Sequence, residues 1–133
     1  MFMLLPLFSS RVSAGFPSPA DDYLEGDLDL NEYLIRTPPA TFLVRVSGNS
    51  MIGKGIYDGD LLVVDRSLEP LDRDVVVAVV EGELTVKQLR FQDKEVWLMP
   101  ANRRYKPLCV TGMDLQIWGV VSSSIHHFRK RVE

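Results

Sequence analysis

The sequence has few residues that could form disulfides or bind metal ions. Its 133 residues include a single cysteine, Cys109, and only two histidines, His126 and His127. One cysteine excludes an internal disulfide framework and a zinc site built from several cysteines. We therefore expect no metal and no cofactor, and a chain that works in a reducing compartment, the cytoplasm.

Long apolar runs are also missing. The N-terminal run MFMLLPLF is far shorter than the roughly 20 apolar residues that cross a membrane. It lacks the pattern of a signal peptide too, because no Lys or Arg precedes it and Pro6 interrupts it. We expect neither export nor membrane association from this pattern.

The chain has no excess of basic residues. It holds 15 Lys and Arg against 18 Asp and Glu, a net charge of −3. Proteins that bind duplex DNA through a broad surface carry a basic footprint, so we expect no specific binding of duplex DNA. The length suits one domain with its own hydrophobic core.

Prolines are concentrated near the N-terminus, and β-strand patterns fill the rest of the chain. Five of the eight prolines lie in residues 1–40, which we expect to form an extended arm with one short helix over NEYLIRT. Later runs are short and either β-branched or alternating: TFLVRVS, DLLVVD, VVVAVV, ELTVKQL, EVWLMP and LQIWGVVSSSI. The sequence predicts a mostly β, compact antiparallel domain over residues 41–133.

The segment SGNSMIGKG at 47–55 has two chemical interpretations. Through Gly48, Gly53 and Lys54 it nearly matches a phosphate-binding loop, G-x-x-x-x-G-K-[ST]. Gly55, however, stands where the magnesium-binding hydroxyl belongs, and a turn and a strand follow instead of the required helix. Nucleotide binding is therefore disfavoured, and the glycines are expected to serve as turn residues.

The second interpretation makes Ser50 a nucleophile, which needs a base to remove its proton. His126 and His127 lie near the C-terminus, where we expect an exposed pair with no catalytic role. Lys87 remains: it lies inside a predicted strand and shares a face with Thr85, so partial burial would lower its pKa. From these residues alone, a lysine on the solvent face of an edge strand is the favoured explanation.

Four motifs, in this order along the chain, resemble the LexA/UmuD family of self-cleaving Ser–Lys peptidases of the bacterial SOS response. They are the bond Ala14–Gly15, the turn SGNSM at 47–51, the strand DGDLLVVD, and the strand TVKQL that carries Lys87. The resemblance covers residues 11–121, and the order of its motifs makes it specific.

The resemblance implies a serine endopeptidase that cuts its own chain. Ser50 would attack the Ala14–Gly15 bond, and Lys87 would be the general base that accepts the hydroxyl proton. Three neighbours would shape the nucleophile turn: Gly48, Asn49 and Met51. The fold implied is that of the LexA/UmuD C-terminal domain, with the arm as substrate.

Only 14 residues precede Gly15 in this sequence, too few for the helix-turn-helix domain of LexA-type repressors. We therefore expect the UmuD/MucA-like branch, which regulates a Y-family translesion DNA polymerase of the UmuC/MucB-like kind. The resemblance also implies a homodimer and activation by the RecA filament on single-stranded DNA. Removal of the arm would produce the form that is competent for mutagenesis.

Two other functions are compatible with the same residues. A leader peptidase shares the Ser–Lys dyad and a related β fold, but we expect it to carry a membrane anchor and an apolar surface patch. A non-catalytic, dimeric binding module of the same fold would keep Ser50 and Lys87 as structural remnants. Incubation with RecA, nucleotide and single-stranded DNA separates the self-cleaving protein from the binding module.

Overall fold

The structure is a computed structural model that describes residues 3–8, 15 and 24–129. The chain divides into two units, Met1–Arg36 and Thr37–Glu133, and each is considered by itself. Nowhere in the described ranges does a helix have the length and apolar character needed to span a membrane.

The first unit contains a two-stranded hairpin and one short helix. Strand β1 (Leu4–Phe8) pairs antiparallel with β2 (Leu24–Asp29), and α1 (Leu30–Leu34) follows. The helix begins there because the Asp29 carboxylate accepts the backbone N–H of Asn31 at 2.9 Å. The predicted short helix is thus present. The hairpin was not predicted, because β1 is an apolar run without alternation and contains a proline.

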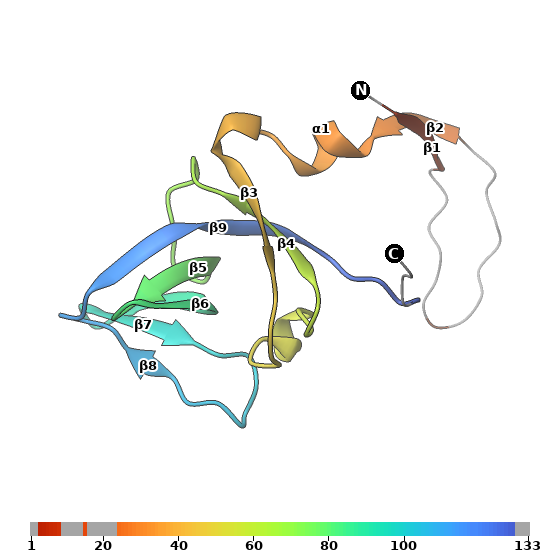
Figure 1. Ribbon diagram of the computed structural model, residues 1–133. Coiled ribbons are helices and arrows are strands. Elements are labelled where there is room, and N and C mark those ends of the chain that lie inside the picture. The colour runs from red at the N-terminus through yellow and green to blue at the C-terminus, as the bar shows by residue number, and fades with distance from the viewer. Residues whose placement is uncertain (1–2, 9–14, 16–23, 130–133) are drawn as a thin grey trace. The chain divides into compact units, whose positions relative to one another are not determined.

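The second unit is one antiparallel sheet of seven strands in the order β3-β4-β9-β5-β6-β7-β8 (Figure 1). Its strands are β3 (Thr41–Arg45), β4 (Leu61–Asp65), β5 (Val75–Val80), β6 (Glu83–Gln92), β7 (Glu95–Met99), β8 (Leu108–Cys109) and β9 (Leu115–Ile125). Single 3-10 turns form at η1 (Pro38–Ala40) and η2 (Ile52–Lys54). The predicted mostly β, antiparallel fold is confirmed.

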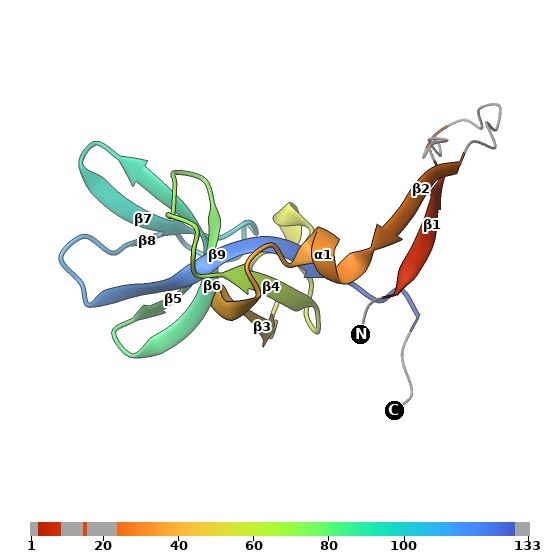
Figure 2. The same cartoon turned by 90° about the horizontal axis from the view of Figure 1, so that it is seen from above.

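The sheet is strongly curved, and the long strand β9 lies between its two halves (Figure 2). Strand β5 therefore buries both of its faces: Val76 and Ala78 belong to one hydrophobic core, and Val77 belongs to the other. This explains why VVVAVV is a continuous apolar run rather than an alternating one. Each fully buried valine contributes about 1.5–3 kcal/mol to folding.

A two-residue turn fixes the register between β5 and β6. Glu81 and Gly82 both have positive φ, 48° and 82°, as the hairpin turn between two tightly paired strands requires. Val80 consequently pairs with Glu83, and the ladder places Lys87 opposite Val76. The side chain of Lys87 therefore points to the face that carries the first core.

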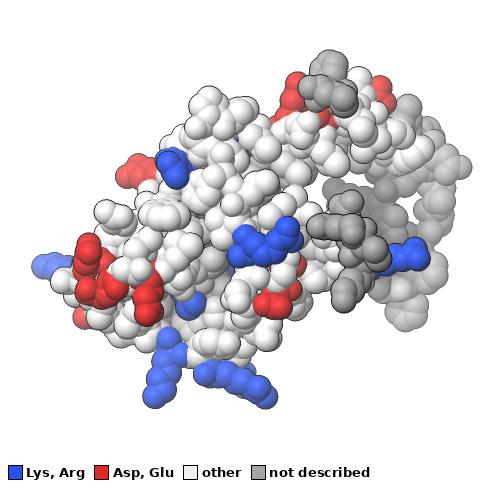
Figure 3. Space-filling model, viewed as in Figure 1, with Lys and Arg blue, Asp and Glu red and all other residues white. Residues whose placement is uncertain are grey.

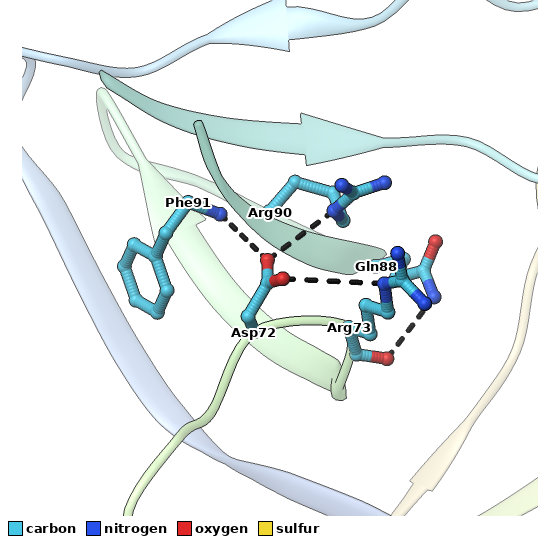
Figure 4. Close-up of polar contacts among 5 residues, drawn as sticks. All are labelled: Asp72, Arg73, Gln88, Arg90 and Phe91. Atoms are coloured by element: carbon cyan, nitrogen blue, oxygen red, sulfur yellow. Dashed lines mark hydrogen bonds and ion pairs between the residues drawn. The ribbon is translucent and has the colours of Figure 1, made fainter. Parts of the chain in front are cut away.

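The connection between β4 and β5 is tied to the outer half of β6 by Asp72 (Figure 4). Its carboxylate accepts the backbone N–H of Phe91 at 2.8 Å and Arg90 Nε at 3.2 Å. Arg73 lies beside it, and the Arg73 carbonyl accepts Gln88 Nε2 at 3.1 Å. The Phe91 N–H, followed by the charge of Arg90, lowers the pKa of Asp72. These contacts hold β6 against the connection.

His126 has a hydrogen-bond partner that the sequence did not indicate. Its Nδ1 lies within hydrogen-bond distance of Asp60 Oδ1, and its ring packs against Tyr57 and Phe128. The carboxylate of Asp60 is buried, with 2% of the residue exposed. The pairing of β4 with β9 puts Leu61 opposite residue 125, which brings the next residue beside Asp60. Both histidines are exposed, as the sequence predicted, and the contact with Asp60 is an addition to that prediction.

We expect His126→Ala to lower the free energy of unfolding by about 1–3 kcal/mol, because the buried Asp60 carboxylate loses a hydrogen-bond partner. Thermal unfolding followed by circular dichroism measures the effect. His127→Ala is the matched control and should leave the melting temperature unchanged. Equal melting temperatures for both variants would contradict the anchoring role of His126.

Candidate active site

Ser50 lies in a tight turn within the connection between β3 and β4. The turn is fixed at Gly48, whose N–H donates to Asp58 Oδ1 at 2.8 Å and whose φ of +92° favours glycine. Next to Ser50, Met51 is only 2% exposed and packs into the second core. The buried methionine and the glycine together set the direction of the Ser50 side chain.

A second brace on this turn comes from the connection between β7 and β8. Ala101 N–H donates to the Ser50 carbonyl at 2.7 Å, and Gly53 N–H donates to the Ala101 carbonyl at 2.7 Å. Asn102 Nδ2 donates to the Asn49 carbonyl at 2.9 Å. Sequence reasoning missed this brace, because no local pattern links segments that lie 53 positions apart.

Lys87 reaches Ser50 from β6. Its Nζ lies 3.0 Å from Ser50 Oγ, 2.9 Å from Thr85 Oγ1 and 3.1 Å from the Val86 carbonyl oxygen. Thr85 lies within reach of Lys87 because alternate residues of a strand point to the same face of the sheet. The structure therefore brings together two candidate residues that are 37 positions apart, and adds Thr85, which sequence reasoning had placed on this face without a role.

Burial makes the Lys87 amine a plausible proton acceptor. Loss of solvent around the half-buried side chain lowers the pKa of Lys87 below its ordinary value of 10.5. In the neutral amine, two N–H groups suffice for Thr85 and the Val86 carbonyl, which leaves the lone pair for the Ser50 hydroxyl. The arrangement can thus take a proton from a serine without a histidine or a carboxylate.

Two hollows meet at Lys87. One cavity of about 250 Å³ is lined by Ser50, Lys87 and the end of β3. A second, of about 400 Å³, has a largely apolar lining that includes Leu98 and Met113. Leu84, Thr85 and Lys87 line both cavities, so the surface is hollowed on both sides of the lysine.

The expected scissile bond is only partly described. Ala14 lies outside the described residues, and Gly15 is exposed. The Ala14–Gly15 bond therefore stays a prediction. The turn at 52–54 is a single 3-10 turn that Gly55 ends with a φ of +77°, and the chain then enters β4 through a further turn. This geometry does not match a phosphate-binding loop, which must open a helix.

The family described as Peptidase S24-like matches this chain over residues 6–122. The chain belongs to this family. Protein SamA of Salmonella typhimurium is 49% identical over 124 residues, which cover 93% of this chain and 86% of SamA. Protein MucA of Escherichia coli is 45% identical over 124 residues, which cover 91% of this chain and 84% of MucA.

The LexA repressor of Acidithiobacillus ferrooxidans is also similar. It is 46% identical over 114 residues, which cover 84% of this chain and 53% of the repressor. Together these matches confirm the resemblance drawn from the motifs, a UmuD/MucA-like member of the LexA group, within the Peptidase S24-like family.

Proposed function

We propose that this protein is a self-cleaving serine endopeptidase of the SOS response, with Ser50 as nucleophile and Lys87 as general base. The observation that carries the proposal is the 3.0 Å contact between Ser50 Oγ and Lys87 Nζ in a chain of a peptidase family. The lowered pKa of Lys87 supports it, because only the neutral amine accepts a proton.

The proposed reaction uses the contact between Ser50 and Lys87 as follows. Lys87 accepts the hydroxyl proton while Ser50 Oγ bonds to the carbonyl carbon of Ala14, and an oxyanion forms. Backbone N–H groups of the nucleophile turn stabilise it; within the described chain, the Ser50 N–H has no backbone acceptor and is free for this role. The C–N bond then breaks, Lys87 returns the proton to the Gly15 amine, and water hydrolyses the ester.

The substrate in this proposal is the protein's own arm, residues 1–40, in cis or from another copy. The hollows on both sides of Lys87 suit an extended peptide that continues beyond the scissile bond in each direction. Small residues at Ala14 and Gly15 allow the backbone to approach the serine closely. The prolines of FPSP, which follow, disfavour a helix and keep the segment extended.

The brace at Gly53 gives a test of how the nucleophile is positioned. A Cβ on Gly53 would lie 2.6 Å from the Ala101 carbonyl oxygen, so Gly53→Ala must displace either its own segment or Ala101, whose N–H holds the Ser50 carbonyl. A displacement near 1 Å costs about 100-fold in rate. We expect Gly53→Ala to slow self-cleavage by about that factor, measured by gel densitometry. Lys54→Ala, on the same turn but exposed, should cleave like the parent, and equal rates for both variants would contradict the role of the brace.

The proposal includes partners. The cleaved protein would act in the cytoplasm as a homodimeric regulatory subunit of a Y-family translesion polymerase, and the RecA filament on single-stranded DNA would favour the cleavable conformation. The sheet edge at β3 and the exposed apolar side chains beside it, such as Leu43, support dimerisation. Analytical ultracentrifugation tests this point, since a monomer at micromolar concentration would contradict it.

Incubation of the purified full chain with RecA, nucleotide and single-stranded DNA tests the peptidase proposal. We expect a shorter product from the parent and none from Ser50→Ala. A parent that stays intact under these conditions would favour the non-catalytic binding module. Activity on added signal peptides would favour a leader peptidase instead.

A further inference from the structure

The connection between β7 and β8 presents a short basic surface. Arg103, Arg104 and Lys106 are exposed there, and so is Tyr105 between them, at 42%. We call these four residues the basic loop. Figure 3 shows Lys and Arg side chains projecting from the lower edge of the molecule, where Figure 1 shows this connection, with acidic side chains above them on the same face.

The cations of the basic loop are available to an external partner. In the ranges that the structure describes, none of them forms an ion pair. The backbone beneath them is fixed, because the Tyr105 N–H donates to the Asn102 carbonyl at 3.1 Å and the Arg104 N–H donates to Asn102 Oδ1 at 3.0 Å. Exposed Lys54 follows Gly53, which is hydrogen-bonded to the same connection.

This local charge contrasts with the net charge of −3 of the whole chain, so a polyanion would be attracted to this surface and not to the protein generally. The exposed ring of Tyr105 favours polyanions that also carry unpaired aromatic bases. An exposed aromatic ring between cations suits unpaired nucleobases, which stack on it while the cations contact the phosphates. In duplex DNA the bases are already stacked on one another.

We propose that the basic loop binds single-stranded nucleic acid, with Arg103, Arg104 and Lys106 on phosphates and Tyr105 stacked on a base. The bound strand would contact the same connection that braces the Ser50 turn through Ala101. This inference does not depend on the peptidase proposal, because it concerns binding, and it is tested with an uncleavable protein.

Fluorescence anisotropy of a labelled oligothymidylate of about 20 nucleotides, with the full-length Ser50→Ala protein as parent, tests the proposal. Three phosphate contacts predict a salt slope of about −2, so the affinity should fall about fourfold for each doubling of salt. Arg103→Glu with Arg104→Glu should weaken binding at least about tenfold. The matched control, Lys94→Glu with Arg129→Glu, has the same net charge and should change the affinity less than twofold.

Tyr105→Ala leaves all charges in place and keeps the test valid if the double variant fails to fold. One lost stacking contact should weaken binding about fivefold or more without changing the salt slope. Equal weakening by the two double variants would overturn the proposal, because binding would then follow net charge. It would also be overturned if polyglutamate at equal charge competed as well as oligothymidylate, since the partner would then be an acidic protein, or if Tyr105→Ala bound like the parent.

Discussion

Ser50→Ala and Lys87→Ala are each expected to abolish self-cleavage, lowering its rate at least about 1,000-fold. Nucleophile and base act as a unit, so removing either one removes the whole reaction path. Lys87→Arg should be equally inactive, because a guanidinium stays protonated and accepts no proton. The rate is measured by gel densitometry of the full chain, with and without RecA on single-stranded DNA.

Two controls make this result specific. Lys94→Ala removes an exposed lysine from the turn between β6 and β7 and should cleave like the parent. Circular dichroism should show that the Ser50 and Lys87 variants keep the β-sheet spectrum of the parent. A folded Lys87→Ala protein that still cleaves at the parent's rate in alkaline buffer would show that the base is a different group.

Self-cleavage without RecA is expected to accelerate about tenfold for each pH unit above neutrality, and then to level off. Burial lowers the pKa of Lys87, so the folded protein holds more neutral amine at any pH than a free lysine would. Below that pKa the neutral fraction grows tenfold with each pH unit. The plateau should begin below pH 10.5, the ordinary value for lysine.

Activation by RecA should shift the pH profile of the self-cleavage rate to lower pH. If RecA favours a conformation in which the arm covers the dyad, the loss of water lowers the pKa of Lys87 further, and the rise in rate begins at lower pH. Initial rates from pH 6 to 11, with Ser50→Ala as the blank for other hydrolysis, give the comparison. A rate that is flat over this range, or that rises only around pH 6.5 as for a histidine, would contradict a lysine base.

The sheet was largely predictable because its signals are local. Short β-branched runs separated by turn residues predicted the six longer strands of the second unit, and the segment NEYLIRT before the proline pair at 38–39 predicted the short helix. The hairpin β1–β2 was missed because its first strand lacks alternation. Strand β8 was missed because two residues carry no periodicity.

The sequence predicted those parts of the site whose side chains are reactive groups, a serine hydroxyl and a lysine amine. Serine on a glycine turn and lysine inside a strand suggested a pair, but only a family resemblance made Lys87 preferable to a solvated lysine. The brace through Ala101, the contact with Thr85 and the pairing of His126 with Asp60 were not anticipated. Each depends on which strands become neighbours, a property of the folded sheet that no short stretch of sequence encodes.

The most direct test of the central claim is the N-terminal sequence and mass of the fragment released after incubation with RecA on single-stranded DNA. The account predicts one product that spans residues 15–133 and begins GFPSPADD, formed by the parent and absent from Ser50→Ala. A product that begins at another residue would contradict the scissile bond. The same product from Ser50→Ala would contradict the peptidase itself.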